Sequence, residues 1–333
     1  MEILVQIKET RSYTIFLESL KTDSTKNNYI YFLNKYLDYT KKQTHDELLK
    51  ETPEKIQQSI DDYVVSMKYS KSKSTIKLYI YAISHFFAIN GVTLNDEMIQ
   101  KLLPDENSKK EQTYSTNDVK KILEAIDISK IKRHTKWYFR KPRARALIHF
   151  FASSGVRLGS IPYMKFGDIE KIGQCYCVRV YANTRHEYLT FLTPEASKSL
   201  NEYLATRTNL TINSSLFDMK YDAIRRLISR LVVKANVTST FPVTQDRTWN
   251  KTKQDWCGTS TRLFLDVPMV HGFRSRWNTI MKNNNDINKS MIEVMMGHTP
   301  EIKLDANYYR PTKENLFLEF QKGIDALTIY REI

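Results

Sequence analysis

Apolar side chains recur at three- and four-residue steps throughout residues 10–103, as they do on helices that bury one face. Hydroxyl and carboxylate side chains at 22–25 and at 70–75 precede two of these helices and can accept bonds from free backbone N–H groups. The periodicity is clearest at Tyr29, Phe32, Leu33, Tyr36 and Leu37. The pattern predicts a first domain, residues 1–103, that is entirely helical.

A polar stretch without periodicity follows at residues 104–113, and it contains Pro104. Such a composition is typical of a linker between domains. We therefore expect a second domain over residues 114–333. The length of 333 residues agrees with two domains of roughly 150 residues each.

The second domain mixes helical and strand patterns. Residues 175–192 are rich in β-branched and aromatic side chains around an Ala-Asn-Thr-Arg turn, which predicts a β-hairpin. Residues 241–266 are polar and aromatic without a clear period, and we expect a loop there. Helices are expected at about 116–125, 143–153, 194–207, 221–234, 272–283, 287–297 and 313–333. The predicted fold class is mainly α with a small β-sheet, a helical domain followed by a mixed α/β domain.

No apolar run approaches the roughly 20 residues of a membrane span, and the first ten residues lack the basic-then-apolar order of a signal peptide. We expect a soluble, cytoplasmic protein. Cys175 and Cys177 lie on one face of a predicted strand, away from any cluster of histidines, and are expected to be reduced, buried thiols. Because no carboxylate or histidine grouping has the spacing of metal ligands, a metal-dependent nuclease is disfavoured.

The chain carries a net charge of +14, and the surplus lies entirely in its C-terminal two-thirds. The first 112 residues hold 16 basic and 16 acidic side chains, whereas the rest hold 35 and 21. In the densest basic run, residues 130–145, cations alternate with Trp137, Tyr138 and Phe139. Such interleaving suits phosphates and stacked bases, although a solvated basic loop has the same composition. The charge as a whole favours double-stranded DNA as the partner.

Four short motifs contain residues that bind or attack phosphates. Arg157 follows a turn of small residues at the end of an apolar helix, in SGVRLGSI. In HGFR, His271 and Arg274 are three residues apart at a helix start and project from one face. MMGH places His298 directly after a helix and a glycine, and a tyrosine pair follows in NYYRP. Taken singly, each motif is also compatible with a structural role.

Read in order, these motifs and the hairpin continuation TRHEYLTFLTPEA resemble the tyrosine recombinase (phage integrase) family over nearly the full chain. The first domain resembles the core-binding domain of that family, and the second resembles its mixed α/β catalytic domain. The EYLTFLTPEA strand and the YYRPT ending are most similar to archaeal or mobile-element integrases. The resemblance implies an enzyme that cuts and rejoins DNA.

The resemblance assigns Arg157 and Arg274 to transition-state stabilisation. Negative charge grows on the equatorial oxygens of a phosphodiester under attack, and guanidinium groups with fixed forks bind that charge better than mobile ammonium groups do. His271 is assigned the role of general base or hydrogen-bond partner, because imidazole titrates near the working pH. His298 is expected to donate to a nonbridging oxygen.

Tyr308 is the expected nucleophile, because it stands two residues before a basic side chain and ten after His298, as the family's nucleophile does. Tyr309 is the alternative. A phenol gives a 3′-phosphotyrosine that stores the energy of the broken bond, so religation requires neither ATP nor metal. The resemblance therefore implies no cofactor.

The hairpin turn departs from the family pattern. The family usually carries a lysine there, which protonates the leaving 5′-oxygen, whereas residues 181–186 contain none. Ungapped comparison places Asn183 or Ala182 at the lysine position. Arg185 supplies charge but is a poor proton donor because guanidinium groups stay protonated. His186 is the other candidate donor.

The resemblance implies a site-specific recombinase or integrase that works as a homotetramer on two paired sites of double-stranded DNA. A DNA-binding relative with impaired catalysis and a type IB topoisomerase are the alternatives. An apolar stripe near the C-terminus packs either against its own domain or against a neighbouring protomer. It consists of Leu316, Phe317, Phe320, Ile324 and Leu327.

Overall fold

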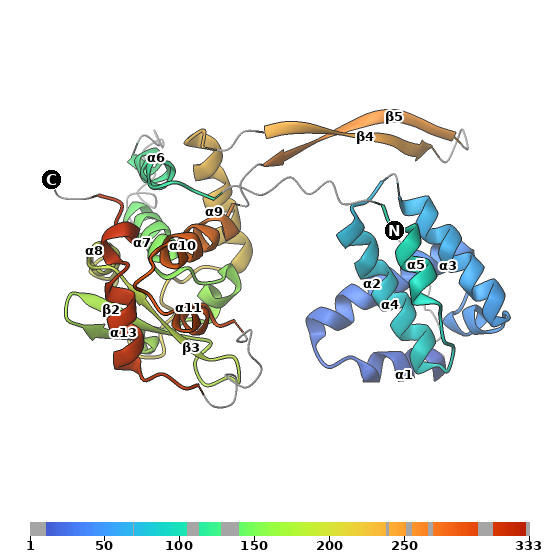
Figure 1. The fold of residues 1–333 in the computed structure, drawn as a ribbon, viewed down its shortest axis with the longest axis horizontal. Coiled ribbons are helices and arrows are strands. Elements are labelled where there is room, and N and C mark those ends of the chain that lie inside the picture. The colour runs from blue at the N-terminus through green and yellow to red at the C-terminus, as the bar shows by residue number, and fades with distance from the viewer. Residues whose placement is uncertain are drawn as a thin grey trace. The chain divides into compact units, whose positions relative to one another are not determined.

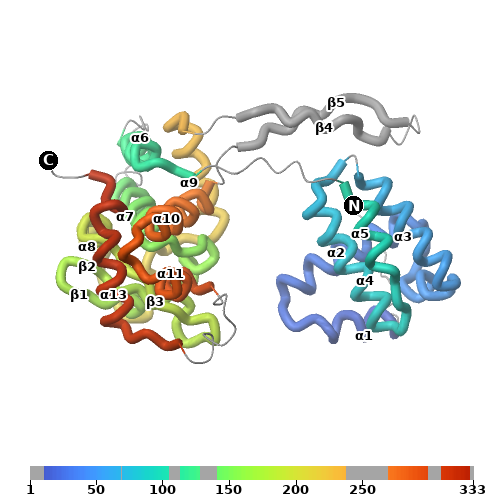
Figure 2. The backbone as a smooth tube through the Cα atoms, viewed as in Figure 1, coloured from blue at the N-terminus to red at the C-terminus, as the bar shows by residue number. Residues whose placement is uncertain are grey.

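The computed structural model describes residues 11–68, 70–104, 113–127, 140–237, 240–250, 255–265, 269–298 and 309–330. The chain divides into two compact units, residues 1–109 with 242–263 and residues 110–241 with 264–333. Figures 1 and 2 show the elements of each unit as a ribbon and as a tube. The division between residues 109 and 110 falls in the stretch expected to be a linker.

Residues 11–104 form only helices where the structure describes them. These are α1 (Arg11–Ser19), α2 (Asp23–Thr40), the 3₁₀ helix η1 (His45–Leu49), α3 (Pro53–Met67), α4 (Lys73–Ile89) and α5 (Asp96–Leu102). Their apolar faces meet in one core. Both predicted caps are present, because the hydroxyl of Thr22 accepts from the N–H of Thr25 and the hydroxyl of Ser72 accepts from that of Thr75.

The second unit combines helices with a three-stranded sheet. Before the sheet lie α6 (Thr116–Asp127), α7 (Arg140–Ser154) and the 3₁₀ helices η2 (Leu158–Tyr163) and η3 (Phe166–Asp168). The strands are β1 (Ile169–Ile172), β2 (Cys175–Val180) and β3 (Tyr188–Leu192), followed by α8 (Pro194–Leu204) and α9 (Tyr221–Lys234). The last described helices are α10 (His271–Asn283), α11 (Lys289–Met296), α13 (Lys313–Gln321) and α14 (Ile324–Leu327). The predicted fold class, mainly α with a small sheet, is confirmed.

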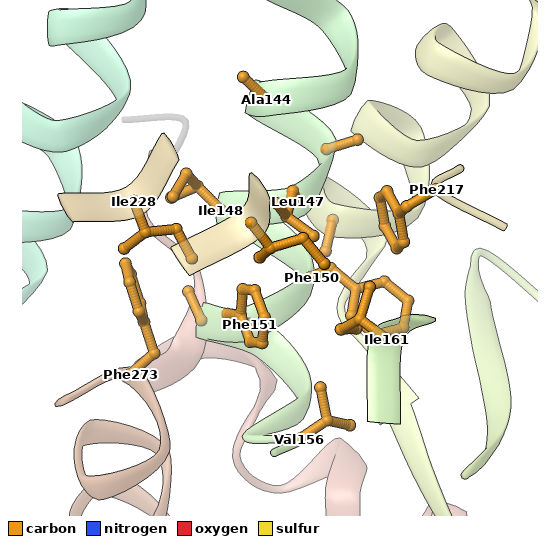
Figure 3. Close-up of a cluster of buried hydrophobic side chains, with 14 of the residues drawn as sticks. Ala144, Leu147, Ile148, Phe150, Phe151, Val156, Ile161, Phe217, Ile228 and Phe273 are labelled. Carbon is orange, nitrogen blue, oxygen red and sulfur yellow. The ribbon is translucent and has the colours of Figure 1, made fainter. Parts of the chain in front are cut away.

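The sheet separates two apolar cores. Its strands pair antiparallel in the order β1-β2-β3, and successive side chains of a strand point to opposite faces. Leu192 of β3 faces the core that Figure 3 shows, where Phe151 of α7 and Phe273 of α10 are neighbours. Phe191 faces the other core, which includes Trp277 of α10. Because α10 contributes to both cores, packing fixes the helix that carries the HGFR motif.

Residues 241–266 form strands, so the prediction of a loop there is wrong. β4 (Thr240–Asn250) and β5 (Asp255–Leu265) make a separate two-stranded sheet. The segment has the threonines and aromatic residues that favour strands, and this content matters more than the missing periodicity. Pro242 is tolerated because both strands of a two-stranded sheet are edge strands.

The apolar stripe near the C-terminus packs against its own unit. Leu316, Phe320 and Leu327 are buried in the second core, and the ring of Phe320 lies 5.4 Å from that of Phe191. The stripe spans two helices, because α13 ends at Gln321 and α14 begins at Ile324. Of the two arrangements that the sequence leaves open, the structure shows packing within the chain's own domain.

Cys175 and Cys177 on β2 are buried free thiols, as expected. Burial raises the pKa of the Cys177 thiol to about 11, so this group stays protonated at neutral pH. Within the described ranges, no helix combines the length and the apolar content that a membrane span requires.

Candidate active site

A left-handed turn places Arg157 just beyond α7. The helix is followed by Gly155, whose φ of 61° lies in the left-handed region. A Cβ atom on Gly155 would lie 2.9 Å from Cγ of Trp277, so both conformation and packing require glycine there. The exposed Arg157 follows, and its Nη1 donates to the carbonyl oxygens of Met296 (3.4 Å) and Gly297 (3.3 Å).

Arg274 approaches the same carbonyl group from α10. Only 3% of this residue is exposed, and its Nη1 donates to the carbonyl oxygen of Gly155 at 2.7 Å. Its Nη2 donates to the carbonyl oxygen of Met296 at 2.6 Å. Met296 therefore accepts from two guanidinium groups, and it holds Arg157 and Arg274 close together although they are far apart in the sequence.

The closeness of two cations is unfavourable when no anion accompanies them. Burial lowers the pKa of the Arg274 guanidinium, and the neighbouring charge of Arg157 lowers it further. Tyr188 and Glu293 act in the opposite sense. An oxyanion that bonds to both guanidinium groups would relieve their repulsion, so the arrangement is suited to a phosphate.

The turn that ends α11 holds His298 against Arg274. The N–H of Gly297, a residue with φ of 62°, donates to the carbonyl of Val294 at 2.9 Å, and the N–H of His298 donates to that of Glu293 at 3.0 Å. These two bonds form a Schellman motif. The imidazole Nε2 lies 2.7 Å from Nη2 of Arg274, and Nδ1 lies 2.5 Å from Oε2 of Glu293.

Both carboxylate oxygens of Glu293 have partners. Oε1 pairs with Nζ of Lys282 at 2.5 Å, and Oε2 pairs with the ring of His298. Burial by itself would raise the pKa of this carboxyl, but the bonds from Lys282 and His298 outweigh burial and hold the pKa below its usual value. The group is therefore ionised at neutral pH and acts only as a hydrogen-bond acceptor.

Tyr188 brings the sheet into contact with this site. A Cβ atom on Gly297 would lie 2.5 Å from Cε1 of Tyr188, so the ring packs directly on that glycine. Burial raises the pKa of the Tyr188 phenol, and the charges of Arg274 and Arg157 oppose the rise. The phenol is thus a neutral group beside the two guanidinium groups.

Solved structures resemble the whole chain in fold, whereas neither a protein-family model nor a curated protein matches it. XerH site-specific recombinase bound to difH substrate is 16% identical, with 87% of this chain and 78% of that chain covered and a TM-score of 0.56. A lambda integrase tetramer bound to a Holliday junction is 15% identical, with 90% and 75% covered and a TM-score of 0.54. The Tn1549 transposon integrase in complex with transposon right end DNA is 11% identical, with 93% and 98% covered and a TM-score of 0.55.

This chain has the tyrosine recombinase fold. The likeness confirms the expected architecture, a helical part followed by a mixed α/β part. Within this tyrosine recombinase fold, three of the residues that the motifs singled out come together, namely Arg157, Arg274 and His298.

The other two predicted residues stand differently. His271 is exposed as the first residue of α10, one helical turn before Arg274, and it makes no hydrogen bond or ion pair with another described residue. Tyr308 lies outside the described residues. Tyr309, the alternative nucleophile, is half-buried and precedes α13.

The basic run at 130–145 is described only from residue 140 onward. Arg145 pairs with Asp127 at 2.5 Å, and Arg143 donates to the carbonyl oxygens of Phe217 and Asp218. These two cations have contacts within the protein. Trp137, Tyr138 and Phe139 lie outside the described residues.

In the tyrosine recombinase fold of this chain, the turn between β2 and β3 is exposed at Asn183 through Glu187. The N–H of Asn183 donates to a carboxylate oxygen of Glu187 at 2.6 Å. Nε of Arg185 donates to Nε2 of His186 at 3.1 Å. Because Nε2 accepts this bond, a neutral His186 carries its proton on Nδ1.

Sequence reasoning missed Tyr188 and Glu293. Tyr188 opens the strand that the resemblance included, but only the three-dimensional packing shows that its ring meets Gly297. Glu293 is five residues before His298, a spacing that does not bring two side chains together on a helix. The left-handed Gly297 closes that gap, and a glycine-histidine pair directly after an apolar helix was the signal that could have pointed to it.

Proposed function

We propose that the protein is a site-specific DNA recombinase or integrase that cuts and rejoins DNA through a 3′-phosphotyrosine intermediate. The observation that carries the proposal is the convergence of Arg157 and Arg274 on the carbonyl oxygen of Met296. One guanidinium group is exposed and the other is buried, so together they offer fixed donors to a phosphate that approaches from solvent. The fold that the chain shares with XerH and lambda integrase supports the assignment.

In the proposed reaction, Oη of Tyr308 attacks the phosphorus, and the bond between phosphorus and the 5′-oxygen breaks. The phenol proton passes to a base, for which His271 is the candidate. Arg157 and Arg274 stabilise the charge that grows on the nonbridging oxygens. Attack by a 5′-hydroxyl of another strand then restores the phosphodiester and frees the tyrosine, so the exchange requires no nucleotide or metal cofactor.

The leaving 5′-oxygen needs a proton, and we assign its delivery to His186. The turn that carries His186 is exposed, so DNA can reach it. The bond from Arg185 leaves the His186 proton on Nδ1, where it is accessible to an approaching oxygen. Arg185 then supplies positive charge near the leaving group.

Double-stranded DNA is the proposed partner, and a homotetramer on two paired sites is the proposed assembly. The surplus of 14 positive charges lies after residue 112, in the part of the chain that carries the site. One solved structure of the same fold is a lambda integrase tetramer on a Holliday junction. DNA exchange of this kind also agrees with a cytoplasmic protein.

A trapping experiment on a pool of DNA sequences tests the nucleophile. The pool consists of duplexes with randomised recognition sequence, each with a nick close to the scissile phosphate, so that the short 5′-hydroxyl fragment diffuses away after cleavage. Covalent protein–DNA adducts are isolated under denaturing conditions, and the trapped duplexes are sequenced. We expect adducts with the wild-type protein and with Tyr309→Phe, and none with Tyr308→Phe, whose affinity for DNA stays close to that of the wild type.

The other outcomes separate the alternatives. Loss of the adduct in Tyr309→Phe together with its survival in Tyr308→Phe would identify Tyr309 as the nucleophile. Binding without any adduct in the wild-type protein would indicate a DNA-binding relative with impaired catalysis. Adducts on all duplexes, with relaxation of supercoiled DNA and no exchange of strands between paired sites, would indicate a type IB topoisomerase.

A further inference from the structure

We propose that Glu293 is a positioning residue that keeps the proton of His298 on Nδ1 and directs Nε2 of that ring into the site. The inference rests on the proposed function, in which His298 faces the phosphate. None of the sequence motifs contains Glu293 in such a role, and its contact with His298 exists only because the chain reverses at Gly297.

The two partners of His298 determine where its proton lies. Arginine has donors and no acceptor, so the 2.7 Å contact between Nη2 of Arg274 and Nε2 of His298 requires a lone pair on Nε2. The ionised Glu293 has acceptors and no donor, so the contact at Nδ1 requires a proton on that nitrogen. A neutral ring with its proton on Nδ1 satisfies both partners.

A bound phosphate changes the demand on Nε2. When a phosphate oxygen takes the place of the Arg274 contact, His298 must donate through Nε2 in order to stabilise it. Moving the single ring proton to Nε2 would leave a bare Nδ1 lone pair facing the Glu293 carboxylate, which is repulsive. The ring therefore gains a second proton, and Glu293 stabilises the resulting cation.

The other charged groups around His298 oppose that gain. Arg274 and Lys282 come from α10, and Arg157 follows α7 and donates to the carbonyl of the preceding Gly297. The Tyr188 phenol from β3 is neutral. Among these described groups, Glu293 alone favours a protonated ring, and its pairing with Lys282 anchors it from the neighbouring helix.

The chain offers a matched control for a variant of Glu293. The Glu319 side chain is 15% exposed, compared with 14% for Glu293, and it likewise pairs with a lysine, Lys322, at 2.7 Å. It accepts from the backbone N–H of Asn288 and not from a histidine. Glu293→Gln and Glu319→Gln thus remove one similarly buried, lysine-paired charge each, and each glutamine keeps an acceptor oxygen.

The first measurement is the rate of adduct formation across about pH 5 to 9 for the wild type and both variants. We expect the profile of Glu293→Gln to move to lower pH by about one unit, with about a tenfold loss at the alkaline end and a smaller loss at the acid end. Glu319→Gln should keep the wild-type profile. An equal loss at every pH in Glu293→Gln, an unchanged rate, or the same shift in Glu319→Gln would each overturn the proposal.

The second measurement does not depend on cleavage. In DNA-free protein with ¹⁵N-labelled histidine, His298→Asn identifies the signals of this ring, and the ¹⁵N shifts report which nitrogen carries the proton. We expect the proton on Nδ1 in the wild type and a mixture of both forms in Glu293→Gln. A proton on Nε2 in the wild type would refute the positioning role. Absence of any adduct would instead refute the proposed function and leave this measurement able to decide the role of Glu293.

Discussion

Two parts of the candidate site are built in different ways. At the corner between α10 and α11, Arg274 is buried and bonded to two backbone carbonyls and to His298. At the turn between β2 and β3, Arg185 and His186 are exposed, and the side-chain hydrogen bond that joins them is between sequence neighbours. The first region is held by long-range contacts, and the second is held by its own short turn.

The difference follows from what each region must do in the proposed reaction. Groups that stabilise growing charge are most effective when they are fixed before the substrate arrives, because no reorganisation is then needed. A group that delivers a proton must reach an oxygen whose position depends on the bound DNA. We infer that charge stabilisation is preorganised in this protein and that proton delivery is completed by the substrate.

The largest expected effect comes from replacing the preorganised guanidinium. Arg274→Lys keeps a positive charge but cannot bond to Gly155, Met296 and His298 together, because an ammonium group has no planar fork. We expect adduct formation to fall by about 10² to 10³-fold, the range for loss of a fixed oxyanion donor. Single-turnover rates on the trapped duplex measure the effect.

Arg276→Lys is the control for that substitution. Arg276 is also buried on α10, and burial lowers the pKa of its guanidinium to about 10, but it bonds to Ala152, Thr116 and Leu327, outside the site. We expect a lower melting temperature and a much smaller loss of adduct. Equal losses of adduct in both variants would show that Arg274 acts through stability alone.

The more locally built turn gives the second prediction. Loss of a general acid slows a reaction by about 10² to 10⁴-fold, and we expect His186→Ala to fall near the lower end because water reaches this exposed turn. Arg185→Ala should cost only several-fold, since it removes charge and not the donated proton. A duplex with a 5′-bridging phosphorothiolate needs no acid, because the thiolate leaves readily.

We therefore expect the phosphorothiolate duplex to restore His186→Ala nearly to the wild-type rate and to leave the smaller defect of Arg185→Ala unchanged. If His186→Ala is equally slow on both duplexes, the histidine is not the acid. The comparison between the two regions would then have to be drawn without a proton donor in the turn.

The two regions also differ in how far the sequence predicts them. The hairpin 175–192 and the helix start at HGFR follow from short-range patterns, and the structure has β2, β3 and α10 there. The identities of Arg157, Arg274 and His298 as neighbours came from a resemblance, because no local pattern states which distant residues share one carbonyl group. The structure supplies that shared acceptor, Met296.

Other features were not predictable from local patterns. Strands β4 and β5 lack the alternation that marks a half-buried strand, so periodicity gave no signal for them. Glu293 meets His298 through a left-handed turn, and the conformation of a single glycine decides that contact. In both cases the deciding factor is a backbone geometry that the hydrophobic pattern does not encode.

The smallest expected effect concerns that glycine, and it tests whether the α10–α11 corner is as tightly built as the distances indicate. Gly297 and Gly173 both have left-handed backbones, with φ of 62° and 59°. An alanine at either position costs about 1–2 kcal/mol for the conformation. At Gly173 nothing lies within 4 Å of the added Cβ, whereas at Gly297 the Cβ would meet the ring of Tyr188.

Gly297→Ala must therefore also displace a ring that is packed against the core, which adds about 1–3 kcal/mol of overpacking. The displaced backbone carries the carbonyl groups that hold Arg157 and Arg274, so adduct formation should fall by about tenfold, the equivalent of about 1.4 kcal/mol in the barrier. Chemical denaturation and the trapping rate measure the two effects, and Gly173→Ala should show only the conformational cost with a normal rate. Identical behaviour of the two variants would mean that the ring moves aside freely, and the contrast between a rigid corner and an exposed turn would then fail at its most tightly packed contact.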